Sequence, residues 1–597
     1  MACFYGRRCL SHPNLCRHSL SAMQRQQPVP FPAWDGNRSQ RGAHKMNFRA
    51  LESEQKLRGG YYTQPDMALF LARWVLEKKP KAILEPSCGD GAFIQAVADL
   101  RPSCVRRVIA CEIQPAEAKK ASERARSGRV FEVCVFVDDF LKWSLPRLCG
   151  PPEFDAVLGN PPFIRYQYLD PELQDRSQQV FEQFGLPFTK HTNAWVPFVI
   201  ASIAQLRPGG RLAMVVPAEI LHVLHAQPLR DYLLKECARI LVLDPDDIWF
   251  SDTLQGVVFL LAEKRDPPSG GIAEISVVPL RGRDTLNGKA GEYFAGSHYL
   301  CGREVNGKWM LALLTACERA LLSHLAEHPH VHPFEAIATV DVGIVTGANK
   351  FFLVPDSVVS EHALQQWAHP MFGRSEHVAG VIYNKKAHEE NRRKGLPTNF
   401  IWFQDALFAE LSESARRYIK RGQNQNLHQR YKCRIRSPWY SVPSVYASPI
   451  GMLKRSHHFP RLVLNRLKAF TTDTAYRITP NGVDASDLVS CFVNSLTALT
   501  AEIEGRHYGG GVLELVPSEI EKMLVPIAGR SRDSLQELDE AIRSDLAPED
   551  VLAAQDARIL VPMGFSAAQC QDLRQAWTRL RHRRQRTECP AIEESED

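Results

Sequence analysis

A glycine-containing turn joins a short apolar segment to a helix-like stretch near residue 90. Residues 83–93 read ILEPSCGDGAF. Glycine lets the backbone approach a ligand closely, and a unit of strand, turn and helix places that approach at the carboxyl edge of a sheet. Position 94 is Ile, so the third glycine of a dinucleotide fingerprint is missing and a pyrophosphate ligand is disfavoured. Alone, Gly89 and Gly91 would also suit a purely structural turn.

Acidic residues follow this turn at spacings that suit a nucleoside. Glu112 lies 21 residues beyond Gly91, at the end of the next predicted strand, where a carboxylate accepts hydrogen bonds from both ribose hydroxyls. A third predicted strand ends in Asp138, Asp139 and Phe140, which offer an acceptor for an adenine amino group and a ring to pack on the base. The combination predicts a nucleoside without phosphates, most simply S-adenosylmethionine.

A second constellation ends the following predicted strand. Residues 154–163 read FDAVLGNPPF, and the two prolines fix the backbone and remove two N–H donors. The side-chain oxygen of Asn160 and the carbonyl oxygen of Pro161 can then accept from an exocyclic amino group, while Phe163 offers a ring for stacking. An amino group that donates both hydrogens aims its lone pair at a methyl sulfonium. For an isolated Asn-Pro-Pro, a rigid turn would be the alternative.

Alternating strand-like and helix-like segments must position these residues. From residue 60 to about 265 the pattern predicts a doubly wound, mostly parallel, Rossmann-like α/β sheet. Strands are expected at 81–84, 105–111, 130–137, 154–158, 212–216, 240–243 and 257–262, and helices at 67–77, 92–100 and 195–206. Residues 266–271 read DPPSGG and are the expected linker to a second domain.

Length and composition bound the remaining possibilities. The chain has 597 residues, of which 44% are hydrophobic and 23% charged, as is typical of a soluble protein with two or three domains. No uncharged apolar stretch approaches the roughly 18 residues of a membrane span. Fifteen cysteines without a CxxC pair indicate reduced thiols in a cytosolic protein and no zinc ribbon.

The basic residues are concentrated between Arg416 and Lys468. This segment holds 13 Lys and Arg and no Asp or Glu, whereas the net charge of the whole chain is +6. Such a segment can neutralise phosphates, and its Arg and Tyr residues can reach base edges, although a solvated surface is the alternative. The residues predicted to contact DNA are Arg416, Arg417, Lys420, Arg421, Arg430, Lys432, Arg434, Arg436, Lys454 and Arg455.

The order of these motifs resembles the gamma class of DNA amino-methyltransferases, which modify the N6 atom of adenine. The resemblance rests on residues 60–65 (GYYTQP), the glycine turn, the spaced acids and the NPPF motif, and it covers residues 60–265. It implies a class I methyltransferase sheet in which Asn160, Pro161 and Phe163 are catalytic, with Phe163 and Phe250 stacked on a flipped base. It also implies that S-adenosylmethionine is bound by Thr63, Glu85, Pro86, Ser87, Gly89, Gly91, Glu112, Asp139 and Phe140.

Downstream segments resemble the target-recognition region of restriction-modification methylases more weakly. They are residues 343–352 (GIVTGANKFF), the pair Asn494 and Ser495, and residues 508–511 (YGGG). The expected domains are a disordered basic leader at 1–45, favoured over an organelle transit peptide, a catalytic domain at 46–265, a mixed α/β DNA target-recognition domain at 272–527 and a helical tail at 528–597.

The expected reaction is direct methyl transfer to N6 of an adenine flipped out of duplex DNA, without metal or covalent intermediate. The resemblance implies a monomer of the bacterial cytoplasm that protects host DNA beside a cognate restriction endonuclease. The NPPF motif is also used for cytosine-N4 methylation, for RNA amino-methylation and for glutamine methylation of release factors. The RNA and protein enzymes are generally shorter. A catalytically silent DNA-binding specificity subunit is the alternative from another class, and Asn160 and Asp139 argue against it. The sequence contains no convincing cluster of metal-binding carboxylates, which argues against a fused endonuclease.

Overall fold

The structure is a computed structural model that describes residues 62–126, 131–249, 256–266, 270–305, 307–404, 406–528, 532–544 and 546–586. These described residues belong to one compact unit. The expected leader at 1–45 and the predicted base-stacking residue Phe250 lie outside the described residues. In the described ranges, none of the helices is long and apolar enough to cross a membrane.

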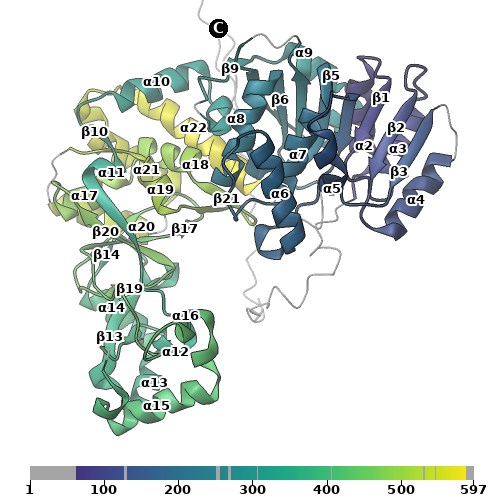
Figure 1. Ribbon diagram of the computed structural model, residues 1–597. Coiled ribbons are helices and arrows are strands. Elements are labelled where there is room, and N and C mark those ends of the chain that lie inside the picture. The colour runs from purple at the N-terminus through teal and green to yellow at the C-terminus, as the bar shows by residue number, and fades with distance from the viewer. Residues whose placement is uncertain are drawn as a thin grey trace, which may run out of the picture. The chain divides into compact units, whose positions relative to one another are not determined.

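A large sheet forms the amino-terminal part, and within the described residues it has nine strands in the order β3-β2-β1-β4-β5-β7-β6-β8-β9 (Figure 1). Its pairs are parallel except where β7 and β9 take part. The expected doubly wound, mostly parallel sheet is confirmed. The strands are β1 Ala82–Glu85, β2 Arg107–Cys111, β3 Glu132–Phe136, β4 Phe154–Gly159, β5 Leu206–Pro217, β6 Cys237–Pro245, β7 Val257–Lys264, β8 Glu274–Leu280 and β9 Leu300–Cys301.

Helices cover both faces of this sheet because successive side chains of each strand point to opposite faces. In β1, Ile83 joins one apolar cluster and Leu84 joins the other. The cluster of Ile83 includes α2 (Pro65–Leu76), α3 (Ala92–Asp99), α4 (Pro115–Arg126) and α9 (Ala290–Gly296). The cluster of Leu84 includes α5 (Phe140–Ser144), α6 (Pro171–Gln183), α7 (Trp195–Ala204) and α8 (Gln227–Glu236).

The sheet continues past the linker that the sequence places at 266–271. Strand β8 pairs in parallel with β6 from Glu274 to Leu280, and β9 pairs with β8. The expected boundary between 265 and 272 therefore falls between two strands of one sheet, which ends at Cys301. A segment rich in Pro, Gly and Ser marks a connection between strands as readily as a linker between domains.

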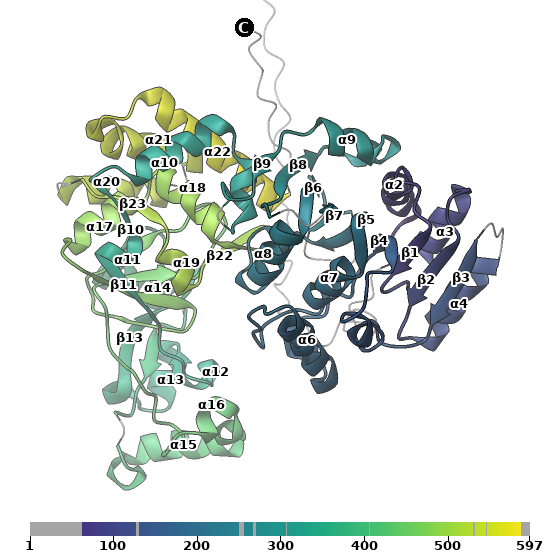
Figure 2. The same cartoon turned by 45° about the horizontal axis from the view of Figure 1, so that its top comes forward.

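The C-terminal region is mixed α/β and ends in helices, as expected (Figure 2). Its described strands form sheets in the orders β11-β20-β16-β18-β14, β12-β15-β13-β19, β17-β22-β21 and β10-β23. The strands are β10 Val331–Pro333, β11 Ala338–Val342, β12 Leu353–Val354, β13 Ala368–Phe372, β14 Ile382–Tyr383, β15 Asn399–Ile401, β16 Ile450–Leu453, β17 Arg455–Ser456, β18 Leu462–Asn465, β19 Phe470–Thr471, β20 Ala475–Pro480, β21 Arg506–Tyr508, β22 Val512–Glu514 and β23 Leu524–Pro526. The helices are α10 Ala316–Ala326, α11 Phe334–Ile337, α12 Asn349–Phe352, α13 Asp356–Glu361, α14 Lys385–Arg393, α15 Glu413–Asn424, α16 Tyr431–Arg434, α17 Ala485–Phe492, α18 Ser495–Glu504, α19 Pro517–Ile520, α20 Arg532–Arg543, α21 Pro548–Ile559 and α22 Ala567–Gln585.

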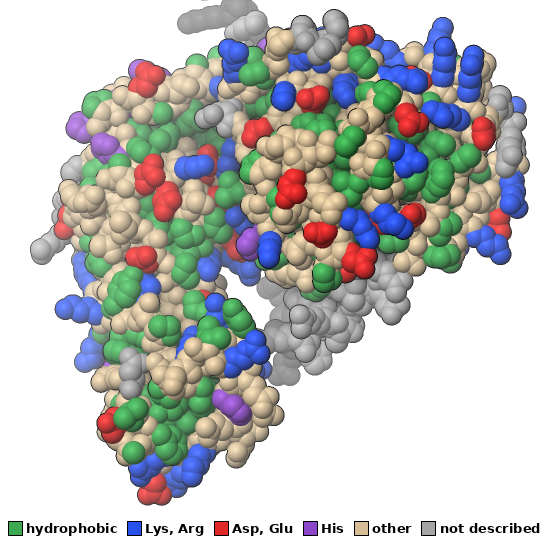
Figure 3. Space-filling view, in the orientation of Figure 1, with side chains coloured by type: hydrophobic (Ala, Val, Ile, Leu, Met, Phe, Trp, Pro, Cys, Tyr) green, Lys and Arg blue, Asp and Glu red, His purple; other side chains and the backbone are tan. Residues whose placement is uncertain are grey.

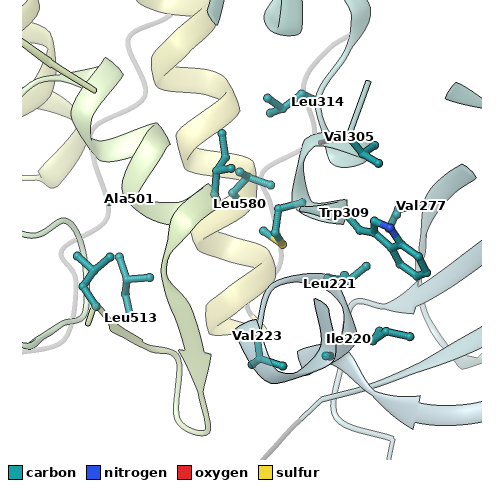
Figure 4. Packing of buried hydrophobic residues seen from close by; sticks show 14 of the residues in the cluster. Ile220, Leu221, Val223, Val277, Val305, Trp309, Leu314, Ala501, Leu513 and Leu580 are labelled. Atoms are coloured by element: carbon teal, nitrogen blue, oxygen red, sulfur yellow. The ribbon is translucent and has the colours of Figure 1, made fainter. Parts of the chain in front are cut away.

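One apolar core runs from the large sheet into the C-terminal region. Figure 4 shows α22, with Leu580, between the segments that carry Ala501 and Leu513 and the segments that carry Leu221 and Trp309. All five residues belong to a single cluster of buried side chains. Helix α22, which lies in the helical tail expected at 528–597, therefore contributes to this core.

Candidate functional site

A cavity of about 790 Å³ lies at the carboxyl ends of β1, β2, β3 and β4. Here the strand order reverses, because β1 lies between β2 and β4, and ligands of doubly wound sheets bind at such a switch point. The volume suits a small organic ligand. Asn160 and eight of the nine predicted cofactor residues line the cavity, namely Thr63, Glu85, Pro86, Ser87, Gly89, Glu112, Asp139 and Phe140.

The ninth residue, Gly91, shapes the turn from outside the cavity wall. It precedes α3 with a φ of 90°, and a Cβ at this position would lie 2.9 Å from the Cα of Ala121 in α4. Glycine alone allows this conformation and this approach without strain. The turn is tied to β2 as well, since the Cys88 N–H donates to the Cys111 carbonyl over 2.9 Å.

Two carboxyl groups at strand ends, one buried and one half-buried, line the cavity. Glu85 is 2% exposed, and its Oε1 has no hydrogen-bond partner among the described residues. Burial raises the pKa of Glu85 well above its usual value, and the charges of Asp90 and Glu112 raise it further. Glu112 accepts from the N–H groups of Gly89 and Gln114, both at 2.9 Å, yet burial still raises its pKa. Such a site favours a ligand with positive charge and several donors.

Protein groups hold both carboxylate oxygens of Asp139. Its Oδ1 caps α5 by accepting from the Leu141 N–H at 2.7 Å and the Lys142 N–H at 3.4 Å. Its Oδ2 accepts from Arg176 Nη1 at 2.8 Å. The ion pair with Arg176 of α6 was not indicated by the sequence. A carboxylate oxygen has a second lone pair, so Asp139 can still accept from a ligand.

The NPPF segment directly contacts the glycine turn at residues 86–91, the predicted cofactor turn. The Ser87 hydroxyl donates to the Asn160 carbonyl over 2.9 Å, and Asn160 Nδ2 donates to Thr63 Oγ1 over 3.2 Å. A Cβ at Gly159 would lie only 3.1 Å from the Cδ of Pro86, so the missing side chain lets the two strand ends approach. The predicted acceptor for an amino group and the predicted cofactor turn are therefore neighbours.

The aromatic residues expected at the site occupy different positions. Phe140 lines the cavity but is 2% exposed, and its ring packs on Phe198 with centroids 5.2 Å apart. Pro161 and Phe163 are not part of the cavity wall, and Phe163 is half-buried against both apolar clusters of the sheet. Stacking by Phe163 and by Phe250 stays a prediction.

Two family models match the chain. The model described as Eco57I restriction-modification methylase matches residues 120–248. The model described as Type II methyltransferase M.Eco57I, C-terminal domain, matches residues 306–560. Together they match more than half of the chain, in both the large sheet and the region beyond it. The chain belongs to the restriction-modification DNA methyltransferases.

Relatives of this methyltransferase extend over most of its length. Type II methyltransferase M.AccI of Acinetobacter calcoaceticus is 22% identical, over 79% of this chain and 86% of that protein. Type II methyltransferase M.XamI of Xanthomonas campestris pv. amaranthicola is 24% identical, over 81% of this chain and 88% of that protein. Among solved structures, the DrdV–DNA complex matches with a TM-score of 0.46 and 12% identity, over 82% of this chain and 57% of that chain.

The cavity of the methyltransferase also contains residues that motif analysis missed. Burial and a hydrogen bond with Glu117 raise the pKa of Tyr62, in the cavity wall, to about 12. Glu117 and Lys120 come from the first turns of α4, and Tyr168 and Asp170 come from the segment before α6. The GYYTQP segment was a signal for Tyr62, but no local pattern marks the other four.

The structure divides the basic segment 416–468 of the methyltransferase into structural and exposed residues. Arg436 is structural, since its Nη1 and Nη2 donate to the carbonyls of Thr346 and Val345 at 2.8 and 2.7 Å. Arg455 pairs with Glu514 at 2.6 Å. The segment itself contains no Asp or Glu, but an acidic side chain from another part of the chain, Glu514, pairs with it.

Several predicted DNA contacts in α15 are also held by protein groups. Arg416 donates to the Ala409 carbonyl at 3.2 Å, and Arg417 lies 4.0 Å from Glu413. Arg421 contacts His362, whereas Lys420 is exposed. Figure 3 shows Lys and Arg side chains, with acidic ones among them, at the end of the molecule where Figure 1 places α15.

The short helix α16 carries the most exposed aromatic side chain of the segment. Tyr431 is 63% exposed, and the charged ends of Lys432 and Arg434 lie 5.5 and 5.7 Å from its ring centre. Ile435 is 62% exposed, and Arg430 is exposed as well. Elsewhere in the segment, Lys454 is half-buried with its Nζ 5.0 Å from the ring centre of Tyr476. Arg430, Lys432 and Arg434 are thus exposed cations close to Tyr431, and exposed cations also lie elsewhere in the segment, at Arg417, Lys420, Arg421 and Arg455.

Proposed function

We propose that this enzyme transfers the methyl group of S-adenosylmethionine to the N6 atom of an adenine that is flipped out of duplex DNA. The proposal is carried by the contact between the cofactor turn and the NPPF segment, through Ser87, Asn160 and Thr63. An acceptor for an amino group and a cavity for a nucleoside share one sheet edge. Methyl transfer between two bound groups requires this proximity.

The cavity fits S-adenosylmethionine in size and in charge. The cofactor supplies an electrophilic methyl group on a positively charged sulfur. Glu85, buried and without a partner at Oε1 among the described residues, suits that positive charge. Glu112 suits the ribose hydroxyls, and Asp139 with Phe140 suits the adenine ring. Thr63, Pro86, Ser87 and Gly89 complete the wall, and Gly91 shapes the turn.

The residues of the NPPF segment are proposed to activate the amino group. Asn160 Oδ1 and the Pro161 carbonyl accept its two hydrogens, and Thr63 holds the amide of Asn160 by accepting from Nδ2. The N6 nitrogen bonds to the methyl carbon as the carbon–sulfur bond breaks, with the electron pair staying on sulfur. One amino proton then leaves through these acceptors to water. Phe163 and Phe250 stack on the flipped base and offset the cost of unstacking it.

The C-terminal region is proposed to recognise the DNA. Exposed cations at Lys420 and around α16 neutralise phosphates, and Tyr431 is placed to reach a base edge or a stacked base. Because the large sheet ends at Cys301, we place the boundary between catalytic and recognition parts near residue 305. We propose a monomer that modifies host DNA beside a cognate restriction endonuclease.

A methyl-transfer assay tests the reaction. Tritiated S-adenosylmethionine is incubated with unmethylated plasmid DNA, ribosomal RNA and a protein mixture, and labelled products are digested to nucleosides or amino acids. We expect label in N6-methyladenine. Label in N4-methylcytosine would move the activity to cytosine, and label in RNA or protein would refute a DNA substrate. No transfer, together with DNA binding, would indicate a specificity subunit.

The Asn160→Ala variant tests the acceptor role. Losing a preorganised acceptor in a buried site is expected to lower kcat by at least about 100-fold. The affinity for S-adenosylmethionine, measured by calorimetry, is expected to stay within about twofold, since Asn160 binds the amino group and not the cofactor. Asn481→Ala, at an exposed loop position, is the control and should keep full activity. Retained transfer in Asn160→Ala would remove the proposed role.

A further inference from the structure

A second, smaller cavity lies between the carboxyl edge of the large sheet and the C-terminal region. Its volume is about 70 Å³, which suits a single small polyatomic ion and not a cofactor. His222, after β5, lines it from the sheet side. The glycine loop between β21 and β22 and the end of α22, including Arg583, line it from the other side.

Two side chains in this cavity have nitrogen atoms that lack a partner among the described residues. His222 is 1% exposed, and its Nδ1 is one of them. The other is Nη2 of Arg583, whose Nε donates to Asp244 and whose Nη1 lies 3.2 Å from Nδ1 of His507. The rings of His222 and His507 are 4.7 Å apart. Buried polar groups are normally hydrogen-bonded, so a ligand that accepts from them is expected here.

Several cations surround His222, and an acid, Glu219, also lines the cavity, where its Oε2 accepts from Asn193 Nδ2 at 3.2 Å. Burial lowers the pKa of His222 well below its usual value, and the charges of Arg583, Lys308, Arg230 and Arg506 lower it further. An anion in the cavity would be attracted by the same charges, whereas a metal cation would be repelled.

Gly509, Gly510 and Gly511 of the loop between β21 and β22 line the cavity. Gly510 has a φ of +77°, and no heavy atom lies within 4 Å of the position that its Cβ would take. Consecutive backbone N–H groups around left-handed residues form concave anion sites. Gly511 serves packing as well, since a Cβ there would lie 2.9 Å from the Cα of Gln585 in α22.

The cavity lies on the sheet edge that also carries Asn160. His222 follows β5, Asn160 follows β4, and these two strands pair in parallel. We propose that the cavity binds one phosphate group of the DNA backbone near the target nucleotide, through His222, Arg583 and the loop of Gly510. This inference rests on the proposed function, because it takes duplex DNA as the substrate. Free inorganic phosphate has the same chemistry, and the experiment must separate the two sources.

A matched pair of glycine variants tests the site. Gly510→Asp places a carboxylate at the cavity, and Gly482→Asp is the control, because Gly482 has a φ of +73° and equally open space. We expect Gly510→Asp to bind a plasmid-derived duplex about tenfold more weakly and to reduce the slope of log K against log salt by about one. Gly482→Asp should stay within about twofold of the wild type. The affinity for S-adenosylmethionine, measured by calorimetry, should be the same in the wild type and in both variants.

Two further measurements identify the source of the phosphate. A duplex with one methylphosphonate beside the methylated base should weaken binding by the wild type, and should weaken binding by Gly510→Asp no further. Inorganic phosphate, titrated without DNA at constant ionic strength, should raise the melting temperature of Gly482→Asp more than that of Gly510→Asp, because it offers the same oxygen atoms to the cavity. If phosphate stabilises only Gly482→Asp while both variants bind DNA alike, the cavity binds free phosphate and the proposal is overturned.

Equal DNA affinities and equal salt slopes for the two variants would also overturn it. The same proteins are assayed for methyl transfer to DNA. An inactive wild type would refute the proposed function, whereas an active wild type with indistinguishable variants would refute only the phosphate site.

Discussion

Glu85 is the residue on which the electrostatics of the proposed cofactor cavity depends most. It ends a strand that is buried on both faces, so its carboxyl group is removed from water. Glu112 has two backbone donors to stabilise its charge, whereas Glu85 Oε1 has none among the described residues. The free enzyme therefore holds a proton at Glu85 above the pH at which an ordinary carboxyl loses it. A bound cation reverses this preference by compensating the charge.

Cofactor binding is therefore expected to depend on pH through Glu85. Below its raised pKa the carboxyl is protonated and must release the proton when a cation binds, so affinity rises with pH and levels off above that pKa. Calorimetry in buffers of different ionisation enthalpy should detect this proton release. Glu85→Gln should bind more weakly at high pH and release fewer protons, while Glu123→Gln, at an exposed position of α4, should match the wild type. Equal release by all three proteins would contradict the assignment.

At the scale of elements, α16 and the residues that follow it up to Arg436 form a small platform. Its buried side chains attach it to the protein, and its exposed side chains are available to DNA. Cys433 is fully buried, and Arg436 ties the platform to the carbonyls of Val345 and Thr346. The outer side chains of Tyr431 and Lys432 are exposed. Lys432 and Arg436 are only four positions apart, yet we predict that Arg436 contributes to stability and Lys432 to DNA affinity.

The pair Arg436→Ala and Lys432→Ala separates these tasks. Arg436→Ala removes two hydrogen bonds from a charged donor and is expected to lower the free energy of unfolding by about 2 kcal/mol. Lys432→Ala should change it by less than about 0.5 kcal/mol but lower DNA affinity and reduce the salt slope by about one. Urea unfolding and fluorescence titration with duplex DNA measure the two quantities. The reverse pattern would show that Arg436 contacts DNA.

Which elements could be predicted from the sequence depends on the range of the interactions that define them. The strands, the glycine turn and the acids at the strand ends are local patterns, and Glu85, Glu112 and Asn160 indeed lie around one cavity. Arg176 was missed because its partner Asp139 lies 37 positions away, and a local sequence pattern does not indicate a contact over that separation. The hydrogen bonds of Arg436 could not be predicted for the same reason, since its acceptors lie about 90 positions earlier.

At the scale of the whole molecule, α22 connects the large sheet to the C-terminal region. Arg583 and Arg586 near its end both contact Asp244, which lies at the end of β6 and is 1% exposed. Arg584 pairs with Glu502 of α18 at 2.7 Å, and both side chains are fully buried. Arg579 and Arg581 of the same helix also form ion pairs, with Glu318 and Glu549. The end of α22 is therefore held to the rest of the chain by internal ion pairs.

The buried pair of Arg584 and Glu502 is expected to control the stability of the whole described unit. Arg584→Ala leaves the Glu502 charge buried without its partner, and should lower the free energy of unfolding by about 3–5 kcal/mol. Arg558→Ala breaks an exposed pair with Glu537 at 2.8 Å and should cost less than about 1 kcal/mol. Combining Arg584→Met with Glu502→Gln should recover at least half of the loss, because it removes both charges.

Because one apolar cluster spans the sheet and the C-terminal region, urea unfolding followed by tryptophan fluorescence and by circular dichroism should give a single, coincident transition for each variant. Two separate transitions, or a loss in Arg584→Ala no larger than in Arg558→Ala, would mean that the two regions fold independently of α22.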